Sequence, residues 1–173
     1  MGADDEFTEF MRGSADRLCR VAYLLTGDRS RAEEMAQDAL ARTYRAWKRV
    51  RGDDAYAYTR RVLVNLHTDW WRRRWREYSV PEAPDRAATG DPASGVTDRE
   101  VLAQALRVLT PRERAVIVLR YYLDLTEAQA ADELGVSVGT VKSTAFRALR
   151  KLRVSPALAD GGQSGAIAME GTA

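Results

Sequence analysis

The chain has 173 residues, of which 45 % are hydrophobic and 30 % are charged, and its formal net charge is +2. This length allows one domain or two small ones, and this composition allows a fold in water. The single cysteine, Cys19, excludes an internal disulfide and a thiolate metal cluster. No apolar run is long enough to span a membrane and no signal pattern begins the chain, so we expect a cytoplasmic protein without membrane insertion.

Catalytic and metal-binding chemistry has few candidate residues in this sequence. The single histidine, His67, has no cluster of possible ligands beside it, and we expect a neutral residue at the surface or in a groove. Neither a nucleophile–base pair nor a phosphate-cradling glycine loop is recognisable. We therefore expect no metal, no cofactor and no enzymatic activity.

The N-terminal part of the chain predicts two amphipathic helices. Apolar residues recur at intervals of three and four over residues 7–25, and the helix is expected to end at 26–28. Ser30 and Glu33 match a capping box that opens a second helix, with an apolar stripe up to residue 50. The outer face of this helix carries acids first and bases later, namely Glu33, Glu34, Gln37 and Asp38, then Arg42, Arg45 and Lys48. Because this order suits the helix dipole, an ordinary exposed surface explains it more simply than a docking face for a partner helix.

Residues 55–78 contain neither proline nor glycine and predict one long helix. Aromatic residues and arginines alternate along it, with Tyr56, Tyr58, Trp70, Trp71 and Trp75 interleaved with Arg60, Arg61, Arg72, Arg73, Arg74 and Arg76. Aromatic rings stack on unpaired bases for about 1–3 kcal/mol each, and arginines neutralise the backbone, so the pattern favours single-stranded nucleic acid as a ligand. The alternative is that the rings belong to the core and the arginines form a solvated face.

The segment 80–96 is rich in proline and glycine and predicts a linker between two domains, residues 1–79 and 97–154. The tail, 155–173, has little apolar surface to bury and is expected to be disordered. Capping boxes at Thr97 and Thr110 open two helices of the second domain. The expected fold class is all-α, with a small helical bundle on each side of the linker.

The last stretch, 125–153, predicts two helices joined by a sharp turn. Thr126 and Gln129 form a third capping box, Gly135 suits a left-handed helix end, and Ser137 can cap the second helix. That helix is apolar on one side, whereas the other side is small and polar near its start and basic further on. Such a helix suits the major groove of DNA, with candidate contacts at Ser137, Thr140, Lys142, Ser143, Arg147 and Arg150. An ordinary helical hairpin with a basic surface is the alternative.

Taken together, the segments RAEEMAQDALARTYRAW and LTPRERAVIVLRYYLDLTEAQAADELGVSVGTVKSTAFRALRKL resemble those of extracytoplasmic-function (ECF) sigma factors, nearest to the SigE-type subfamily. The resemblance implies that the first domain is sigma region 2 and the second is region 4. It reverses the preference for an ordinary surface on the acidic helix. In the family that helix docks on the β′ clamp helices of RNA polymerase, which implies roles for Glu34, Gln37, Asp38, Arg42 and Arg45.

The resemblance also implies which residues meet promoter DNA. The helix over residues 55–78 would hold opened −10 bases, with candidate contacts at Tyr58, Arg60, Arg61, Asn65, Trp70, Arg72, Arg73 and Arg74. The final helix would read the −35 element, where many members carry an arginine at the position of Thr144. The implied partners are core RNA polymerase, through its β′ clamp helices and β flap, promoter DNA and an anti-sigma factor. A stand-alone helix-turn-helix regulator, which binds a symmetric operator as a dimer, is the alternative function.

Overall fold

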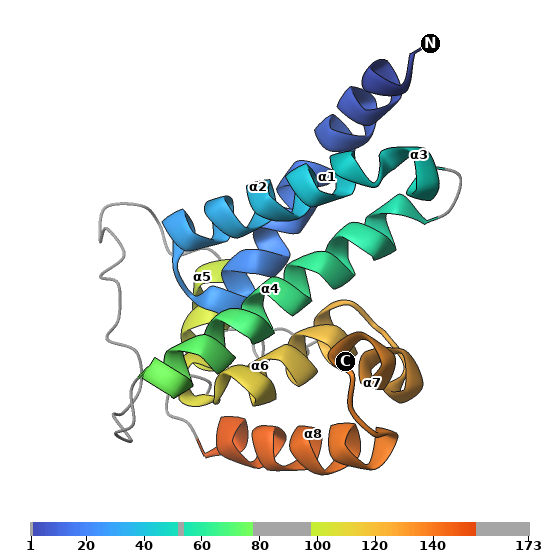
Figure 1. The fold of residues 1–173 in the computed structure, drawn as a ribbon. Helices are drawn as coiled ribbons and strands as arrows, with labels where there is room; N and C mark the ends of the chain where they lie inside the picture. The colour runs from blue at the N-terminus through green and yellow to red at the C-terminus, as the bar shows by residue number, and fades with distance from the viewer. Residues whose placement is uncertain (1, 52–53, 78–97, 155–173) are drawn as a thin grey trace, which may run out of the picture.

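The computed structural model describes residues 2–51, 54–77 and 98–154, and in these ranges every regular element is a helix (Figure 1). The side chains of residues 74–77 are not described, so candidate Arg74 is placed by its backbone alone. The expected linker, the expected tail and the cap Thr97 also lie outside the described residues. The all-α prediction is confirmed for the part of the chain that the structure describes.

The first two helices form an antiparallel pair. Helix α1 (Ala3–Thr26) ends at Gly27, which has a left-handed φ of 69° and donates its amide to the Tyr23 carbonyl. Helix α2 (Arg29–Arg45) is capped by Asp28, whose Oδ1 accepts the Arg31 amide at 2.8 Å. The predicted capping box at Ser30 is therefore wrong. Asp28 follows Gly27 with the extended backbone that an N-cap needs, so the helix begins earlier and Ser30 lies inside it.

The second helix ends earlier than its apolar stripe predicts. Ala46 separates α2 from the short α3 (Trp47–Val50), and α4 (Ala55–Glu77) then runs back across α2. The buried hydroxyls of Thr43 and Thr59 are 2.9 Å apart and hydrogen-bond α2 to α4. Both hydroxyls also donate to carbonyls of their own helices, so these polar groups are satisfied in the core.

The C-terminal helices follow the expected start signals. Helix α5 (Asp98–Ala105) continues into the 3₁₀ turn η1 (Leu106–Val108), and α6 (Pro111–Ile117) continues into the π-turn η2 (Val118–Tyr122). The capping box of Thr110 and Glu113 is confirmed, with Pro111 in the first turn. Helices α7 (Glu127–Leu134) and α8 (Val138–Arg153) complete the group, and α8 packs chiefly on α6.

The two groups of helices, α1–α4 and α5–α8, pack directly against each other. Helix α6 contacts both α1 and α4, and α7 contacts α4 (Figure 1). Their buried apolar residues form one continuous cluster that includes Leu25 and Leu63 from the first group and Leu106 and Leu119 from the second. Polar bonds also cross the boundary, because Arg107 Nη2 donates to the Gly27 carbonyl at 3.2 Å. The first helical group and the second therefore share one core in this structure.

His67 lies inside this shared core, with only 2 % of its surface exposed. Burial lowers its pKa to about 3, and the positive charges of Arg114 and Arg31 act in the same direction. A neutral imidazole was expected, but its expected place at the surface or in a groove is wrong. The reason is tertiary, since α6 covers this side of α4 where Pro111 begins the helix.

Candidate nucleic-acid interface

The turn between α7 and α8 is held by three local signals that the sequence predicts. Thr126 Oγ1 accepts the Gln129 amide at 3.2 Å, and Gln129 Oε1 accepts the Thr126 amide at 2.8 Å. Gly135 ends α7 with a left-handed φ of 63°. Ser137 Oγ then accepts the Thr140 amide at 3.1 Å and starts α8. The predicted helix-turn-helix geometry is thus present, with α8 fixed at its first turn.

Helix α8 has one buried side and one exposed side. Val141, Ala145, Ala148 and Leu152 are buried in the core. The predicted DNA-facing residues lie opposite them: Ser137, Lys142, Ser143, Arg147 and Arg150 are exposed and Thr140 is half-buried. The structure therefore brings these candidates together on the exposed side of α8. Helix α8 itself lies along the lower edge of the molecule in Figure 1.

Phe146 is a further residue of this surface, and it was not among the DNA contacts predicted from the sequence. Its side chain is 64 % exposed, and it lies between Lys142 and Ser143 on one side and Arg150 on the other at helical spacing. The Arg150 guanidinium carbon is 5.9 Å from the centre of its ring. A large exposed aromatic in the middle of a polar helix face is a signal that the helical wheel alone could have revealed.

Thr144 occupies the position at which the sequence departs from many ECF sigma factors, and it does not face outward. It is 1 % exposed, and its Oγ1 accepts a hydrogen bond from Arg147 Nη2 at 3.4 Å. A long charged side chain would have to leave this buried position. Thr144 therefore contributes to the packing beneath α8, and its hydroxyl helps to position Arg147.

Two lysines of α8 contact carboxylates of their own helical group. Lys142 Nζ is 3.5 Å from Glu127, and Lys151 Nζ is 2.8 Å from Glu113. Burial alone would raise the pKa of Glu113, but hydrogen bonds from Lys151 and Thr110 outweigh burial and lower it. Lys151 therefore stabilises the start of α6, whereas Lys142 remains at the exposed edge.

The expected polymerase-facing residues form an exposed stripe along α2. Glu34, Gln37, Asp38, Arg42 and Arg45 are all exposed on its outer side, where positions 34, 38, 42 and 45 recur at intervals of four, four and three residues and Gln37 lies beside Asp38. Within the described part of the chain their side chains make neither hydrogen bonds nor ion pairs. Such a stripe has its full polar capacity available to a partner.

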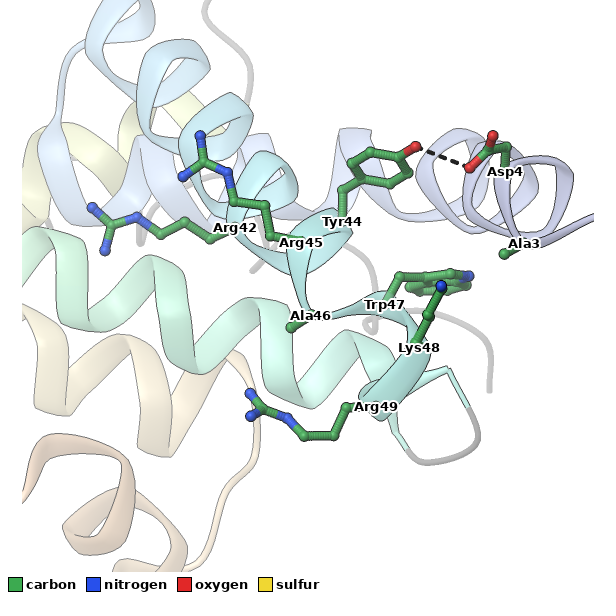
Figure 2. A pocket seen from close by; sticks show the side chains of 9 residues that line it. All are labelled: Ala3, Asp4, Arg42, Tyr44, Arg45, Ala46, Trp47, Lys48 and Arg49. Carbon is green, nitrogen blue, oxygen red and sulfur yellow. Dashed lines mark hydrogen bonds between the residues drawn. The ribbon is translucent and has the colours of Figure 1, made fainter.

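The basic end of this stripe borders a hollow of about 570 Å³ between α1 and the α2–α3 junction (Figure 2). Four cationic side chains line it, contributed by Arg42, Arg45, Lys48 and Arg49. On the far side Tyr44 donates to Asp4 Oδ1 at 2.9 Å, and this hydrogen bond raises the pKa of the phenol. Ala46 and the buried Trp47 also line the hollow. The surplus of positive charge suits an anionic partner surface.

Helix α4 divides its candidate residues between two sides. Tyr58, Arg61, Asn65 and Arg72 share one side at intervals of three, four and seven residues, and Arg73 is exposed near the end. Trp70 lies elsewhere, half-buried, with the Arg31 guanidinium 3.3 Å from the centre of its ring. Its ring also packs edge-on against that of Trp71, with 4.7 Å between the two ring centres. For Trp70 the structure therefore favours the core alternative.

Two arginines of α4 are bound to carboxylates of α7. Arg60 donates from Nε and Nη2 to Glu133, and Arg61 donates from Nη2 to Asp132. The Arg60 and Glu133 side chains are only 12 % and 8 % exposed, whereas those of Arg61 and Asp132 are 44 % and 77 % exposed. Both arginines are candidate −10 contacts, and in this structure their guanidinium groups are occupied.

The described residues give no sign of a metal site or a membrane span. No group of three or more His, Cys, Asp or Glu side chains among them is arranged to hold a metal ion. None of the described helices is both long and apolar enough to cross a membrane.

Comparisons with known proteins match both helical groups. The family "Sigma-70 region 2" matches residues 10–77, and "Sigma-70, region 4" matches residues 99–152. The RNA polymerase sigma-E factor of Streptomyces coelicolor is 42 % identical over 158 residues, which cover 88 % of this chain and 87 % of that protein. The ECF RNA polymerase sigma factor SigL of Mycobacterium tuberculosis is 37 % identical over 148 residues, covering 80 % of this chain and 81 % of the relative.

Solved structures show the same fold. The sigma factor RpoE of Bartonella quintana, solved with the anti-sigma factor NepR, aligns with a TM-score of 0.66 at 24 % identity, over 85 % of this chain and 94 % of that one. CnrH, solved with the cytosolic domain of CnrY, aligns with a TM-score of 0.58 at 22 % identity, over 90 % and 88 %.

Proposed function

Because this chain belongs to the ECF sigma factors, which bind core RNA polymerase and direct it to promoters, we propose that its two helical groups read the two promoter elements separately. Core polymerase and promoter DNA are its partners, and transcription initiation is its function. The observation that carries the residue-level proposal is the capped α8 with its exposed polar and basic side. No covalent step is assigned to the chain, and we place its work in the cytoplasm with the polymerase.

In the proposed −35 complex, α8 lies in the major groove with its N-terminal end toward the bases. Thr140, Lys142 and Ser143 are near that end and would contact base edges. Arg147 and Arg150 are further along and are suited to bases or flanking phosphates. Each good base contact discriminates by about 1–3 kcal/mol, so a few such side chains are enough to select an element.

In the proposed −10 complex, α4 holds unpaired bases of the opened strand. Tyr58 and Asn65 lie on one side of the helix with Arg61 and Arg72, so a ring, an amide and two cations face the same strand. Unstacking a base costs a few kcal/mol, and stacking together with backbone contacts offsets that cost. Arg60 can join this surface only when its bond to Glu133 is broken.

The proposed polymerase contact is the exposed stripe of α2 and the basic hollow beside it. The acidic side chains of Glu34 and Asp38 are separated from the basic ones of Arg42 and Arg45 by about one to three helical turns, so a partner of complementary charge order would dock in one orientation. The β flap would contact the second helical group. An anti-sigma factor is a further proposed partner, because RpoE was solved in complex with one.

Binding to core polymerase and transcription from a cognate promoter test this assignment. We expect Asp38→Arg to weaken core binding, whereas Asp16→Arg, an equal charge change on exposed α1, leaves it unchanged. Arg147→Ala should retain core binding but lose initiation, while Arg12→Ala should retain both. If the wild-type chain bound duplex DNA but never core polymerase, the stand-alone regulator would be the better reading. The match to region 2 over residues 10–77 already disfavours that reading.

A further inference from the structure

The hollow beside the α2–α3 junction gathers positive charge without a matching set of acids. The chain turns at Ala46, so cations from the end of α2 and from α3 line the same space of about 570 Å³ (Figure 2). These cations are Arg42, Arg45, Lys48 and Arg49, and Asp4 is the one carboxylate among the described residues that line the hollow. Four positive charges and one negative charge leave a formal surplus of three.

The four cations have no protein acceptor within the part of the chain that the structure describes. None of their side chains donates a hydrogen bond or forms an ion pair there. Like charges three or four positions apart on a helix repel one another, and Arg42 and Arg45 stand in this relation at the end of α2. A bound anion would relieve this repulsion, so the folded protein would be stabilised by such a ligand.

Trp47 adds an unused hydrogen-bond donor to the wall of the hollow. Its side chain is 6 % exposed, and its ring packs against Phe7 and Phe10 with 5.1 Å between ring centres in each case. The indole Nε1 is buried and has no hydrogen-bond partner among the described residues, which is uncommon in folded proteins. The next residue, Lys48, has a long exposed side chain, and its movement would let an anion reach this N–H.

The size and chemistry of the hollow suit a small polyanion that contains phosphates. Its volume lies within the range of about 300–1,000 Å³ that is usual for sites of small molecules. Guanidinium groups bind phosphate oxygens through a fork of paired donors, and lysine supplies a compact charge. One phosphate can engage only part of this set, whereas a chain of phosphates is long enough to engage several of its members. Tyr44 on the rim is 48 % exposed, so its ring can stack on a base attached to such a chain.

We propose that the hollow binds the phosphate chain of a small anion, which is held by the four cations and by the Trp47 N–H. The chain can come from free inorganic triphosphate or from a nucleoside triphosphate. Arg42 and Arg45 also belong to the proposed polymerase contact, so an occupied hollow would weaken binding to core polymerase. That consequence rests on the proposed function, whereas the site itself does not.

The binding test uses the full chain without polymerase. The wild-type protein is titrated by calorimetry with inorganic triphosphate and, separately, with adenosine triphosphate, at fixed ionic strength and without divalent cations. We expect saturable one-to-one binding of both ligands, at least about tenfold tighter than that of sulfate. Equal affinities would identify the phosphate chain as the whole ligand, and tighter binding of the nucleotide would add the base. Binding no tighter than that of sulfate would overturn the proposal.

Matched double variants locate the bound anion. Lys48→Gln/Arg49→Gln removes two exposed cations that line the hollow, and it should weaken triphosphate binding by at least about tenfold. Arg12→Gln/Arg112→Gln removes two equally exposed cations that do not line it, and it should change the affinity by less than about twofold. Equal losses in the two variants would show a diffuse effect of net charge and would contradict the proposal. The absence of a loss in Lys48→Gln/Arg49→Gln would contradict it as well.

The Trp47 indole provides a readout at the site itself that does not depend on a variant. In a proton–nitrogen correlation spectrum, triphosphate should shift the Nε1–H resonance of Trp47, because that group gains an acceptor. The indole resonances of Trp70 and Trp71, which pack against each other on α4, should stay in place. A Trp47 resonance that does not move at saturation would count against the site.

A single strand of nucleic acid is the competing ligand for the same cations. A short oligothymidylate is therefore titrated under the same conditions, and we expect triphosphate to remain bound at Trp47 in its presence. Displacement of triphosphate by an equimolar strand would assign the hollow to nucleic acid and overturn the proposal. Failure of the proposed function would look different, because core polymerase with the wild-type chain would then not initiate at any promoter.

Discussion

The Arg114 guanidinium donates a hydrogen bond to the main-chain carbonyl of Leu25, 3.1 Å away, and so joins α6 to the last turn of α1. Two further carbonyls, those of Leu106 and Leu109, accept from the same side chain at 3.1 and 3.4 Å. One buried cation thus satisfies acceptors from both helical groups. The boundary between these groups is polar as well as apolar, and several properties of the protein depend on it.

The substitution Arg114→Met should strongly lower the stability of the folded protein. The substitution leaves three carbonyls without the donor they have in the core, and an unsatisfied buried acceptor costs about 1–3 kcal/mol. We expect the free energy of unfolding, measured in urea, to fall by about 3 kcal/mol or more. Arg112→Met, two residues earlier and exposed, is the control and should change it by less than about 0.5 kcal/mol. Equal effects of the two variants would contradict the assigned role of Arg114.

His67 should make the stability of the protein depend on pH below neutrality. Its pKa is lowered to about 3 in the folded chain, whereas an unfolded histidine titrates near its ordinary value of 6.5. Between these values the unfolded state binds the proton and the folded state does not, so stability falls as pH falls. Over the step from pH 6.5 to pH 5 the loss should be about 1.6 kcal/mol.

The chain contains no other histidine, so this pH dependence can be assigned to one residue. Urea unfolding at a series of pH values measures it, and His67→Gln should flatten the profile between pH 6.5 and 5. Glu113 does not interfere in this window, because its lowered pKa means that its own contribution is lost only at more acidic pH. A wild-type profile as flat as that of His67→Gln would show that the imidazole is solvated.

Phe146 should contribute to −35 recognition through the methyl group of thymine. The ring is exposed in the middle of the α8 surface, and an apolar side chain in the major groove contacts that methyl group. Replacing thymine by deoxyuracil in a −35 duplex removes the methyl group alone. We expect this replacement to weaken wild-type binding by about 1 kcal/mol and to have no effect on Phe146→Ala. If wild type and variant responded alike to deoxyuracil, the ring would have another role.

Two glycines should respond in opposite ways to the same substitution. Gly135 has a φ of 63° at the end of α7, so Gly135→Ala should cost about 1 kcal/mol although nothing lies within 4 Å of the added carbon. Gly13 lies inside α1 with equally open space, so Gly13→Ala should stabilise the chain by about 0.5–1 kcal/mol. Thermal unfolding of the two variants measures both effects. A loss of stability at both sites would mean that space, and not backbone conformation, decides the result.

Local signals in the sequence determined the parts of the fold that depend on neighbours three or four residues apart. Capping at Thr110, Thr126 and Ser137 is of this kind, and so is the helix end at Gly135. The two-sided character of α8 follows from the same spacing. These local signals predicted the all-α class and the helix-turn-helix, which the structure confirms. The resemblance of longer segments to those of ECF sigma factors predicted the family, which the comparisons confirm.

The sequence alone did not decide between competing local signals for where a helix begins or ends. Asp28 and Ser30 both suit an N-cap, and the structure uses Asp28 because the turn at Gly27 leaves it extended. Likewise the apolar stripe up to residue 50 predicted one helix, although the backbone turns at Ala46 to pack Trp47 against Phe7 and Phe10.

Only the tertiary structure decided which charged and polar residues meet across the chain. Arg60 and Glu133 are 73 residues apart, and nothing in either segment indicates that the other lies opposite. The burial of His67 and the carbonyls bound by Arg114 depend in the same way on how α6 and α7 lie against α4 and α1. The burial of Thr144 depends on how α8 packs on α6 and α7. The physical reason is that caps and helix faces are set by spacing along the chain, whereas a guanidinium finds its carboxylate only after the helices that carry them have packed.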